Sequence, residues 1–350
     1  MNIKFLEALS NADGIASNEQ EVRDVLLNEL RDYADEVDSD NMGSIIFKKG
    51  NKGPKIMICA HIDEVGFIVR SISEQGQVML MSVGGVKPLA QFMQRVRITT
   101  EDGKKIHGII QSSYVDGRAE KMYVDLGAQS AQDVYDLGIQ VGDMVTYTTS
   151  FEEMDIQGIV TGKAFDDRLG CYIFGEVLKR LKDINHPNTV YMVGTSSEEV
   201  GIRGAKTAVY KVNPDVVFPI DVACFNDEFV RNHTNQRQIG KGMMQTNFDR
   251  TLAPNRKLVS LVRDTAKKLH KPLQLDMFNA GGTDGGEVHK SRDGKPTVVS
   301  CLPVRYGHCA FSIAHKQDIE DAIEIFVEII KNFDDKTYED SIQFLGGKGK

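Results

Sequence analysis

The sequence predicts an α/β fold in which a mixed central sheet is flanked by helices and a small β-barrel or β-sandwich domain is inserted. Three observations predict it. Strand-like and helical segments alternate before residue 67 and again after residue 159, as is typical of α/β folds. The stretch between them holds short strand-like pieces separated by turn signals, which indicates a separate β unit. The 350 residues also exceed the roughly 250 to 300 that one hydrophobic core usually serves.

These observations divide the chain into three parts. We expect residues 1–66 and 160–345 to form one discontinuous domain and residues 67–159 to form the inserted β-rich domain. The Gly/Lys-rich residues 346–350 are expected to be a flexible tail.

The first part is predicted to begin with helices and to continue with two strands. Ser17 followed by Gln20 is a capping-box signature, and apolar residues then recur at helical spacing as far as Tyr33. Strand-like runs follow at residues 44–48 and 55–60.

The inserted part shows short β-like runs and one short helix, at residues 131–137. Asp102-Gly103 predicts a hairpin turn between the first two runs. The strand candidates are residues 95–99, 106–111, 122–126 and 144–149.

The third part returns to α/β alternation. A helix is predicted after Asp166-Asp167, because apolar residues recur at its spacing from Leu169 to Leu181. Further strands are predicted at residues 189–194, 216–220, 273–278 and 297–302, and further helices at residues 257–270 and 317–333.

Charge and composition exclude several classes of function. The net charge is −8 and no long basic cluster occurs, which argues against nucleic acid or an anionic membrane as partner. No apolar run approaches the ~20 residues of a membrane span, and residues 1–9 do not resemble a signal peptide. The five cysteines are an odd number without a CxxC pair, which suits a reducing compartment. We therefore expect a cytoplasmic protein.

Residues able to bind metal gather at the edges of the predicted elements. His61 and Asp63 follow one predicted strand, Glu198-Glu199 follow another, and Asp166-Asp167 open a helix. Asp221 is expected to end the strand at residues 216–220, and His308 follows Tyr306-Gly307. Mixed nitrogen and oxygen donors of this kind suit zinc, cobalt or manganese.

Each residue taken alone has a simpler explanation. A lone histidine after a strand is more often a hydrogen-bonded structural residue, and Glu198-Glu199 could be a solvated acidic turn. Asp166-Asp167 could be an ordinary helix N-cap. The whole set at element ends is what favours a metal site.

Four short motifs carry a resemblance to a known family. The ordered set of candidate residues looks like that of the co-catalytic dizinc metallopeptidases, whose catalytic domain is of the zinc-exopeptidase type. The flanking motifs resemble the glutamyl aminopeptidase and tetrahedral aminopeptidase family over nearly the whole chain. These motifs are Ala60-His61-Ile62-Asp63-Glu64-Val65-Gly66, Gly162-Lys163-Ala164-Phe165-Asp166-Asp167-Arg168, Ser197-Glu198-Glu199-Val200-Gly201 and Gly281-Gly282-Thr283-Asp284-Gly285-Gly286. Asp221-Val222-Ala223-Cys224 and Arg305-Tyr306-Gly307-His308-Cys309 resemble the branch linked to sugar-utilisation operons and labelled aminopeptidase or endoglucanase.

The resemblance implies two divalent metal ions per subunit, with zinc expected first and cobalt or manganese as alternatives. Asp166 would bridge the two ions, His61 and Asp221 would complete one site, and Glu199 and His308 the other. The same resemblance implies a cis peptide bond between Asp166 and Asp167.

The remaining roles implied by the resemblance concern catalysis, substrate and assembly. Glu198 would be the general base that takes the proton of a metal-bridging water, and Asp63 would orient His61. The loop with Gly281, Gly282, Thr283 and Asp284 would line the substrate cleft. The inserted domain would make dimer contacts within a tetrahedral homo-dodecamer.

The expected activity is removal of N-terminal residues from short unblocked peptides. A deacylase of N-acyl amino acids or peptides on the same scaffold is the alternative, because its amide chemistry would be identical. A glycosidase fits less well, since its two carboxylates must flank the scissile bond about 5 to 9.5 Å apart and tryptophan is absent. Thiol catalysis by Cys309 beside His308 also fits less well, because buried cysteines are usually inert.

Two departures from the family pattern lie beside proposed ligands. Residues 222–227 replace a small-residue segment containing Gly-Asp, and Gly307 stands where isoleucine is common. The shape of the pocket and the preferred N-terminal residue therefore cannot be transferred from the family.

Overall fold

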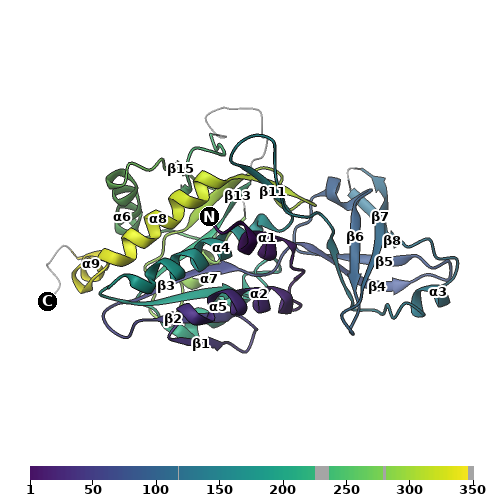
Figure 1. Ribbon diagram of the computed structural model, residues 1–350, viewed down its shortest axis with the longest axis horizontal. Helices are drawn as coiled ribbons and strands as arrows, with labels where there is room; N and C mark the ends of the chain where they lie inside the picture. The colour runs from purple at the N-terminus through teal and green to yellow at the C-terminus, as the bar shows by residue number, and fades with distance from the viewer. Residues whose placement is uncertain (117, 225–235, 279–280, 346–350) are drawn as a thin grey trace.

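The computed structural model describes residues 1–116, 118–224, 236–278 and 281–345. They form a large α/β unit and a smaller barrel that projects from one end of it (Figure 1). The predicted fold class, a mixed sheet flanked by helices with an inserted barrel, is confirmed. The exact domain boundaries at residues 66/67 and 159/160 remain a prediction, and the predicted tail lies outside the described residues.

The large unit is built on an eight-stranded sheet with the strand order β1-β2-β12-β3-β13-β16-β14-β15. The four strands β12, β3, β13 and β16 run parallel in its middle. The strands are β1 (Glu36–Ser39), β2 (Ile45–Lys49), β12 (Thr189–Thr195), β3 (Lys55–His61), β13 (Val216–Cys224), β16 (Ser300–Val304), β14 (Met244–Thr246) and β15 (Gln274–Asp276). The carboxyl ends of the four parallel strands lie at the same edge of the sheet, where ligands bind in open α/β folds.

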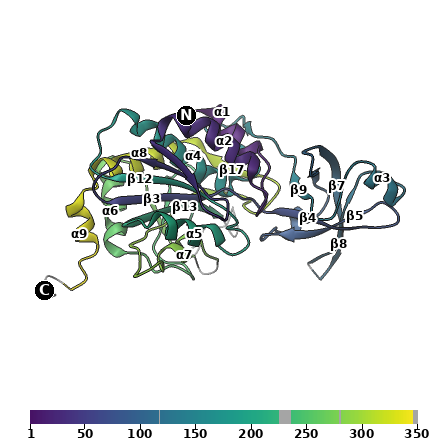
Figure 2. The same cartoon turned by 90° about the horizontal axis from the view of Figure 1, so that it is seen from below.

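Both faces of the sheet are covered, and β3 shows why its sequence is apolar throughout. Ile56 and Ile58 point into the core under α1, α2, α4, α6 and α8, whereas Met57 and Cys59 point to the opposite face under α5 and α7. Figure 2 shows α1, α2 and α8 on one side of the sheet and α5 and α7 on the other. The helices are α1 (Ile3–Asn11), α2 (Gln20–Leu30), α4 (Phe165–Arg180), α5 (Arg203–Val212), α6 (Arg256–Lys268), α7 (Gly285–Val288), α8 (Lys316–Asn332) and α9 (Asp335–Ser341).

The inserted stretch forms a closed antiparallel barrel with its own apolar core. Its strands, in barrel order, are β4 (Gly66–Ile72), β5 (Val78–Val83), β8 (Arg118–Asp125), β7 (Lys105–Val115), β6 (Arg95–Thr99) and β9 (Met144–Tyr147), and α3 (Ala131–Tyr135) lies between β8 and β9. The predicted hairpin at Asp102-Gly103 is confirmed, because β6 and β7 pair antiparallel around it. A small three-stranded sheet has the strand order β10 (Glu152–Glu153), β11 (Ile159–Gly162) and β17 (Ser312–His315). Its first two strands come directly after the barrel in the sequence.

Two local predictions were wrong. Ser17 does not cap a helix, because α2 begins at Gln20 with Glu19 as its N-cap residue, and the Glu19 carboxylate instead accepts a hydrogen bond from the Ser197 N–H. Asp221 does not end a strand, because β13 continues to Cys224 through its pairing with β16. In both places a tertiary contact overrides the local pattern.

Within the described residues, no helix is long and apolar enough to cross a membrane.

Candidate metal centre

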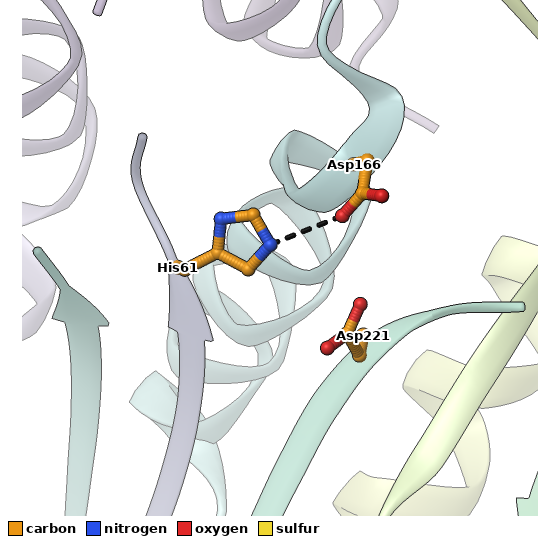
Figure 3. Close-up of side chains that lie close together, drawn as sticks. All are labelled: His61, Asp166 and Asp221. Carbon is orange, nitrogen blue, oxygen red and sulfur yellow. Dashed lines mark hydrogen bonds and ion pairs between the residues drawn. The ribbon is translucent and has the colours of Figure 1, made fainter. Parts of the chain in front are cut away.

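The candidate metal-binding residues meet at the carboxyl ends of the parallel strands. His61 is the last residue of β3, and Asp221 lies in β13, the neighbouring strand. Asp166 comes from the start of α4, where the peptide bond to Asp167 is cis. The side chains of His61, Asp166 and Asp221 converge on one point (Figure 3). Separate strands and one helix start therefore supply a single cluster.

Two sets of three side chains have ligand atoms within 4.8 Å of one another, and Asp166 belongs to both. We name them the inner group (His61, Asp166, Asp221) and the outer group (Asp166, Glu199, His308). His61 Nε2 lies 3.0 Å from Asp166 Oδ1, and His308 Nε2 lies 3.2 Å from Asp166 Oδ2. The two carboxylate oxygens of Asp166 therefore face different histidines, as a residue shared by two metal ions would require.

Asp63 holds both His61 and the loop that carries the two glutamates. His61 Nδ1 lies 3.5 Å from Asp63 Oδ1 and 3.0 Å from the Asp63 carbonyl oxygen. The two oxygens of the Asp63 carboxylate accept hydrogen bonds from the backbone N–H groups of Glu198 and Glu199, at 2.9 and 3.1 Å. This arrangement leaves Nε2 of His61 facing the inner group.

The electrostatics of the cluster fit a bound cation. Glu199 Oε1 is buried and has no hydrogen-bond partner among the described residues, although it lies 3.5 Å from His308 Nε2. Burial and the charge of Asp166 raise the pKa of Asp221. The same two causes raise the pKa of Glu199 to about 7. Carboxylates that repel one another in a buried site are stabilised by a cation, and two imidazoles with three carboxylates suit divalent metals.

Asp166 and His308 attract each other strongly. Burial alone would raise the pKa of Asp166, but the hydrogen bonds from His308 and His61 hold it below its ordinary value. Burial alone would lower the pKa of His308, whereas Asp166 and Glu199 raise it to about 10. Both shifts have the same cause, the close pairing of the Asp166 carboxylate with the His308 imidazole.

Comparison with known proteins identifies the family. Residues 43–325 match the family described as M42 glutamyl aminopeptidase. The chain belongs to this family. It is therefore an enzyme, a metallo-aminopeptidase.

Sequence matches to relatives cover nearly the whole chain. The M42 chain is 36% identical over 332 residues to FrvX of Escherichia coli (strain K12), an aminopeptidase by name, covering 91% of this chain and 92% of that protein. It is 30% identical over 334 residues to the glutamyl aminopeptidase of Lactococcus lactis subsp. cremoris (strain MG1363), covering 91% and 92%.

Solved structures agree with this assignment. The TET aminopeptidase of Thaumarchaeota archaeon SCGC AB-539-E09 has a TM-score of 0.93 at 37% identity, covering 97% of this chain and 99% of that one. The TET1 peptidase of Pyrococcus horikoshii, which can assemble into a tetrahedron or a large octahedral shell, has a TM-score of 0.84 at 25% identity, covering 95% and 99%.

The M42 chain has a cleft over the candidate metal-binding cluster, and Glu198 lines it. Burial raises the pKa of Glu198, and the charges of Asp221 and Asp284 raise it further. The cleft is lined by both groups and by Gly85, Glu198, Ile202, Val222, Cys224, Arg237, Phe278, Gly281, Gly282 and Thr283.

Of the four residues expected to bind substrate, Gly281, Gly282 and Thr283 line the cleft. Gly282 packs so tightly that a Cβ atom there would lie 2.6 Å from Thr251 Oγ1. Asp284 is instead buried behind the cleft wall, where its carboxylate accepts a 2.6 Å hydrogen bond from Thr195 Oγ1. Their roles toward substrate remain a prediction, and the adjoining residues 279–280 lie outside the described part of the chain.

Sequence reasoning missed a contribution of the barrel to the outer group. His308 Nδ1 donates a hydrogen bond to the Gly85 carbonyl oxygen at 3.0 Å, just after β5. A Cβ atom on Gly84 would lie 3.1 Å from Glu199 Cβ, and one on Gly85 would lie 3.0 Å from His308 Nδ1. The available signal was the pair of glycines after the apolar run at residues 78–83, which allows a close backbone approach.

Sequence reasoning also missed a buried ionic network behind the inner group. Lys163 Nζ lies 2.6 Å from Glu64 Oε1 and 3.2 Å from Asp13 Oδ1, and Arg168 Nη2 lies 3.3 Å from Glu64 Oε1. Asp13 also pairs with Arg97 of the barrel at 2.5 Å. Lys163, Arg168 and Glu64 were visible in the motifs, but their burial was not.

Proposed function

We propose that the protein is a dinuclear-metal aminopeptidase that removes N-terminal residues from short unblocked peptides. The observation that supports this most directly is the pair of three-residue groups that share Asp166, with Glu198 facing the same cleft. We propose two divalent ions per subunit, zinc first, with cobalt or manganese as alternatives. The inner group would hold one ion and the outer group the other, with Asp166 bridging.

The metals would lower the pKa of a water molecule and polarise the scissile carbonyl of the peptide. Residues of the chain would carry out the proton transfers. The Glu198 carboxylate accepts the proton that the attacking water loses and then donates it to the leaving amine nitrogen, so the C–N bond breaks to give a free amino acid and a shortened peptide. Asp63 keeps Glu198 in place through its hydrogen bond to the Glu198 N–H.

The Glu198→Gln variant tests this role. The amide keeps the shape of the side chain but cannot accept the proton, so we expect kcat to fall by at least about 100-fold. Two metal ions per chain should remain by elemental analysis, because Glu198 belongs to neither group. Release of free amino acid from unblocked peptides measures the activity, and N-acylated peptides in parallel test the deacylase alternative.

A matched control is Glu287→Gln, since Glu287 of α7 forms an exposed ion pair with Lys290 and does not line the cleft. It should retain normal kcat and both ions. If Glu198→Gln remained as active as this control, Glu198 would not be the base.

We also propose that the barrel makes dimer contacts within a homo-dodecamer. The TET1 peptidase of Pyrococcus horikoshii forms a tetrahedral assembly. The inserted stretch here exposes apolar side chains that suit a protein interface: Met81, Leu89, Phe92, Met93, Ile109 and Val115. Light scattering should give the mass of twelve chains, and a monomer would contradict the proposal.

A further inference from the structure

Gly307, which immediately precedes His308, lies directly against Cys224 at the end of β13. A Cβ atom built on Gly307 would overlap the Cys224 Sγ atom and would lie 3.2 Å from Cys224 Cβ. The next nearest atom, Val304 Cγ2, lies 3.7 Å away, which is an ordinary contact. The space that a side chain at residue 307 would need is therefore taken by one thiol.

Cys224 is well placed to link the two metal-binding groups. It lies three residues after Asp221 on the same strand, and its register partner in β16 is Val304. The chain then turns through Gly307 to reach His308, and Cys224 itself lines the cleft. One strand, β13, thus carries a residue of the inner group and, at its end, a side chain that touches the turn of the outer group.

The turn that carries His308 is held from its other sides by backbone contacts. Arg305 and Ile313 exchange N–H···O hydrogen bonds of 3.0 and 3.2 Å. The Lys87 N–H donates to the His308 carbonyl oxygen at 3.0 Å, beside the bond from His308 to Gly85. The packing of Gly307 on Cys224 adds a contact on the side of the turn that faces β13.

We propose that Cys224 is a positioning residue that acts by its volume: it packs under Gly307 and sets the height of His308 over the outer group. This inference rests on the proposed assignment of His308 as a metal ligand. Cys224 performs no thiol chemistry in this role. Chains that carry a larger residue at 307 would need a smaller residue at 224, so the two positions form one packing unit.

A clash variant and a rescue variant test the packing unit. Gly307 does not have a left-handed φ, so alanine is compatible with its backbone and Gly307→Ala acts through the overlap with Cys224. We expect the variant to fold, to bind the first metal ion like the wild type and to bind the second ion at least about tenfold more weakly, comparable to loss of an outer-shell partner.

The rescue variant is Cys224→Gly combined with Gly307→Ala, because glycine also removes the Cys224 Cβ contact at 3.2 Å. It should restore binding of the second ion. Cys224→Ser, which nearly preserves the volume, should bind two ions like the wild type. Isothermal titration of the metal-free protein with zinc gives the affinity and stoichiometry of both ions, and thermal unfolding checks that each variant is folded.

Two results would overturn the inference: Gly307→Ala binding both ions normally, or the double variant binding no better than Gly307→Ala alone. Loss of the second ion in Cys224→Ser would also overturn it, since the thiol would then act chemically. The titration measures metal binding without substrate, whereas the Glu198→Gln test measures peptide hydrolysis. Either proposal can therefore be overturned without the other.

Discussion

The inner and outer groups share Asp166 but are built in different ways. The inner group takes His61 and Asp221 from β3 and β13, adjacent strands in the middle of the sheet, and His61 is only 2% exposed. The outer group takes Glu199 and His308 from loops, and the His308 side chain is 35% exposed. The inner group is thus part of the sheet itself, whereas the outer group is assembled from loops.

The supports of the two groups differ in the same way. Behind the inner group, Lys163, Glu64 and Asp13 form a buried ionic network. The outer group depends on a backbone carbonyl of the barrel, at Gly85, and on the packing of Gly307. The inner group is therefore supported mainly by side chains buried in the large unit, with Asp13 also paired to Arg97 of the barrel, whereas the barrel contacts a residue of the outer group directly.

The largest effect is expected from Asp166→Ala, which removes the residue common to both groups. Each group would retain two ligands, so both ions should be lost and activity should fall by more than about 100-fold, beyond the loss seen for outer-shell partners. Elemental analysis and peptide hydrolysis measure the two effects. Asp264→Asn, at an exposed site on α6, is the control. If Asp166→Ala still contained one ion per chain, one of the two groups would hold its ion without Asp166.

A smaller effect, on stability, is expected from Asp13→Asn in the network behind the inner group. Asp13 is fully buried and its partners include Lys163, Arg97 and Lys105. Removing one partner from a buried ionic network should lower the free energy of unfolding by roughly 3 to 5 kcal/mol at neutral pH. The control Glu153→Gln, which breaks an exposed pair with Lys316, should cost less than about 1 kcal/mol.

The effect of Asp13→Asn should depend on pH. Burial alone would raise the pKa of Asp13, but the charges of Lys163, Arg97 and Lys105 hold it well below 3.8, despite the nearby Glu64 and Glu21. A depressed folded-state pKa stabilises the protein above the unfolded value, and this stabilisation is lost as the pH falls through the folded value. Urea unfolding at several pH values should show the difference between wild type and variant shrinking below pH 3.8. A difference that stayed constant with pH would contradict this role for Asp13.

The inner group was more accessible to sequence reasoning than its surroundings. An apolar run that ends in His61-Ile62-Asp63 indicates a strand end with two functional side chains, and β3 does end at His61. Asp221 was placed at a strand end, yet it lies inside β13, because pairing with β16 extends the strand. The residue was identified, but its setting depends on a partner strand about 80 residues away, which no local pattern reveals.

The supports of both groups could not be predicted for a physical reason. The glycine pair at residues 84–85 indicates a close backbone approach, but Gly85 contributes a carbonyl oxygen, which every residue has, so the pattern does not reveal that His308 is its partner. Lys163 and Arg168 are cations that usually lie at the surface, and only the folded chain places both against Glu64. Sequence patterns predict side chains with distinctive chemistry, whereas backbone contacts and buried charge pairs depend on tertiary structure.

The smallest effect compares the two groups directly, first in the wild-type protein. If the outer group is the more exposed and the less rigidly supported, its ion should be removed first when the chelator concentration is raised stepwise. We expect metal content to fall from two ions to a plateau of one before the second ion is lost. His308→Ala should contain one ion per chain before any chelator is added. It should keep that ion up to the chelator concentration at which the wild type loses its last ion. His61→Ala should lose its remaining ion at lower chelator concentration, because only the outer group would then hold one. Two results would show that burial in the sheet does not determine which ion is held more firmly. One is simultaneous loss of both ions from the wild type. The other is that the ion left in His61→Ala resists more chelator than the ion left in His308→Ala.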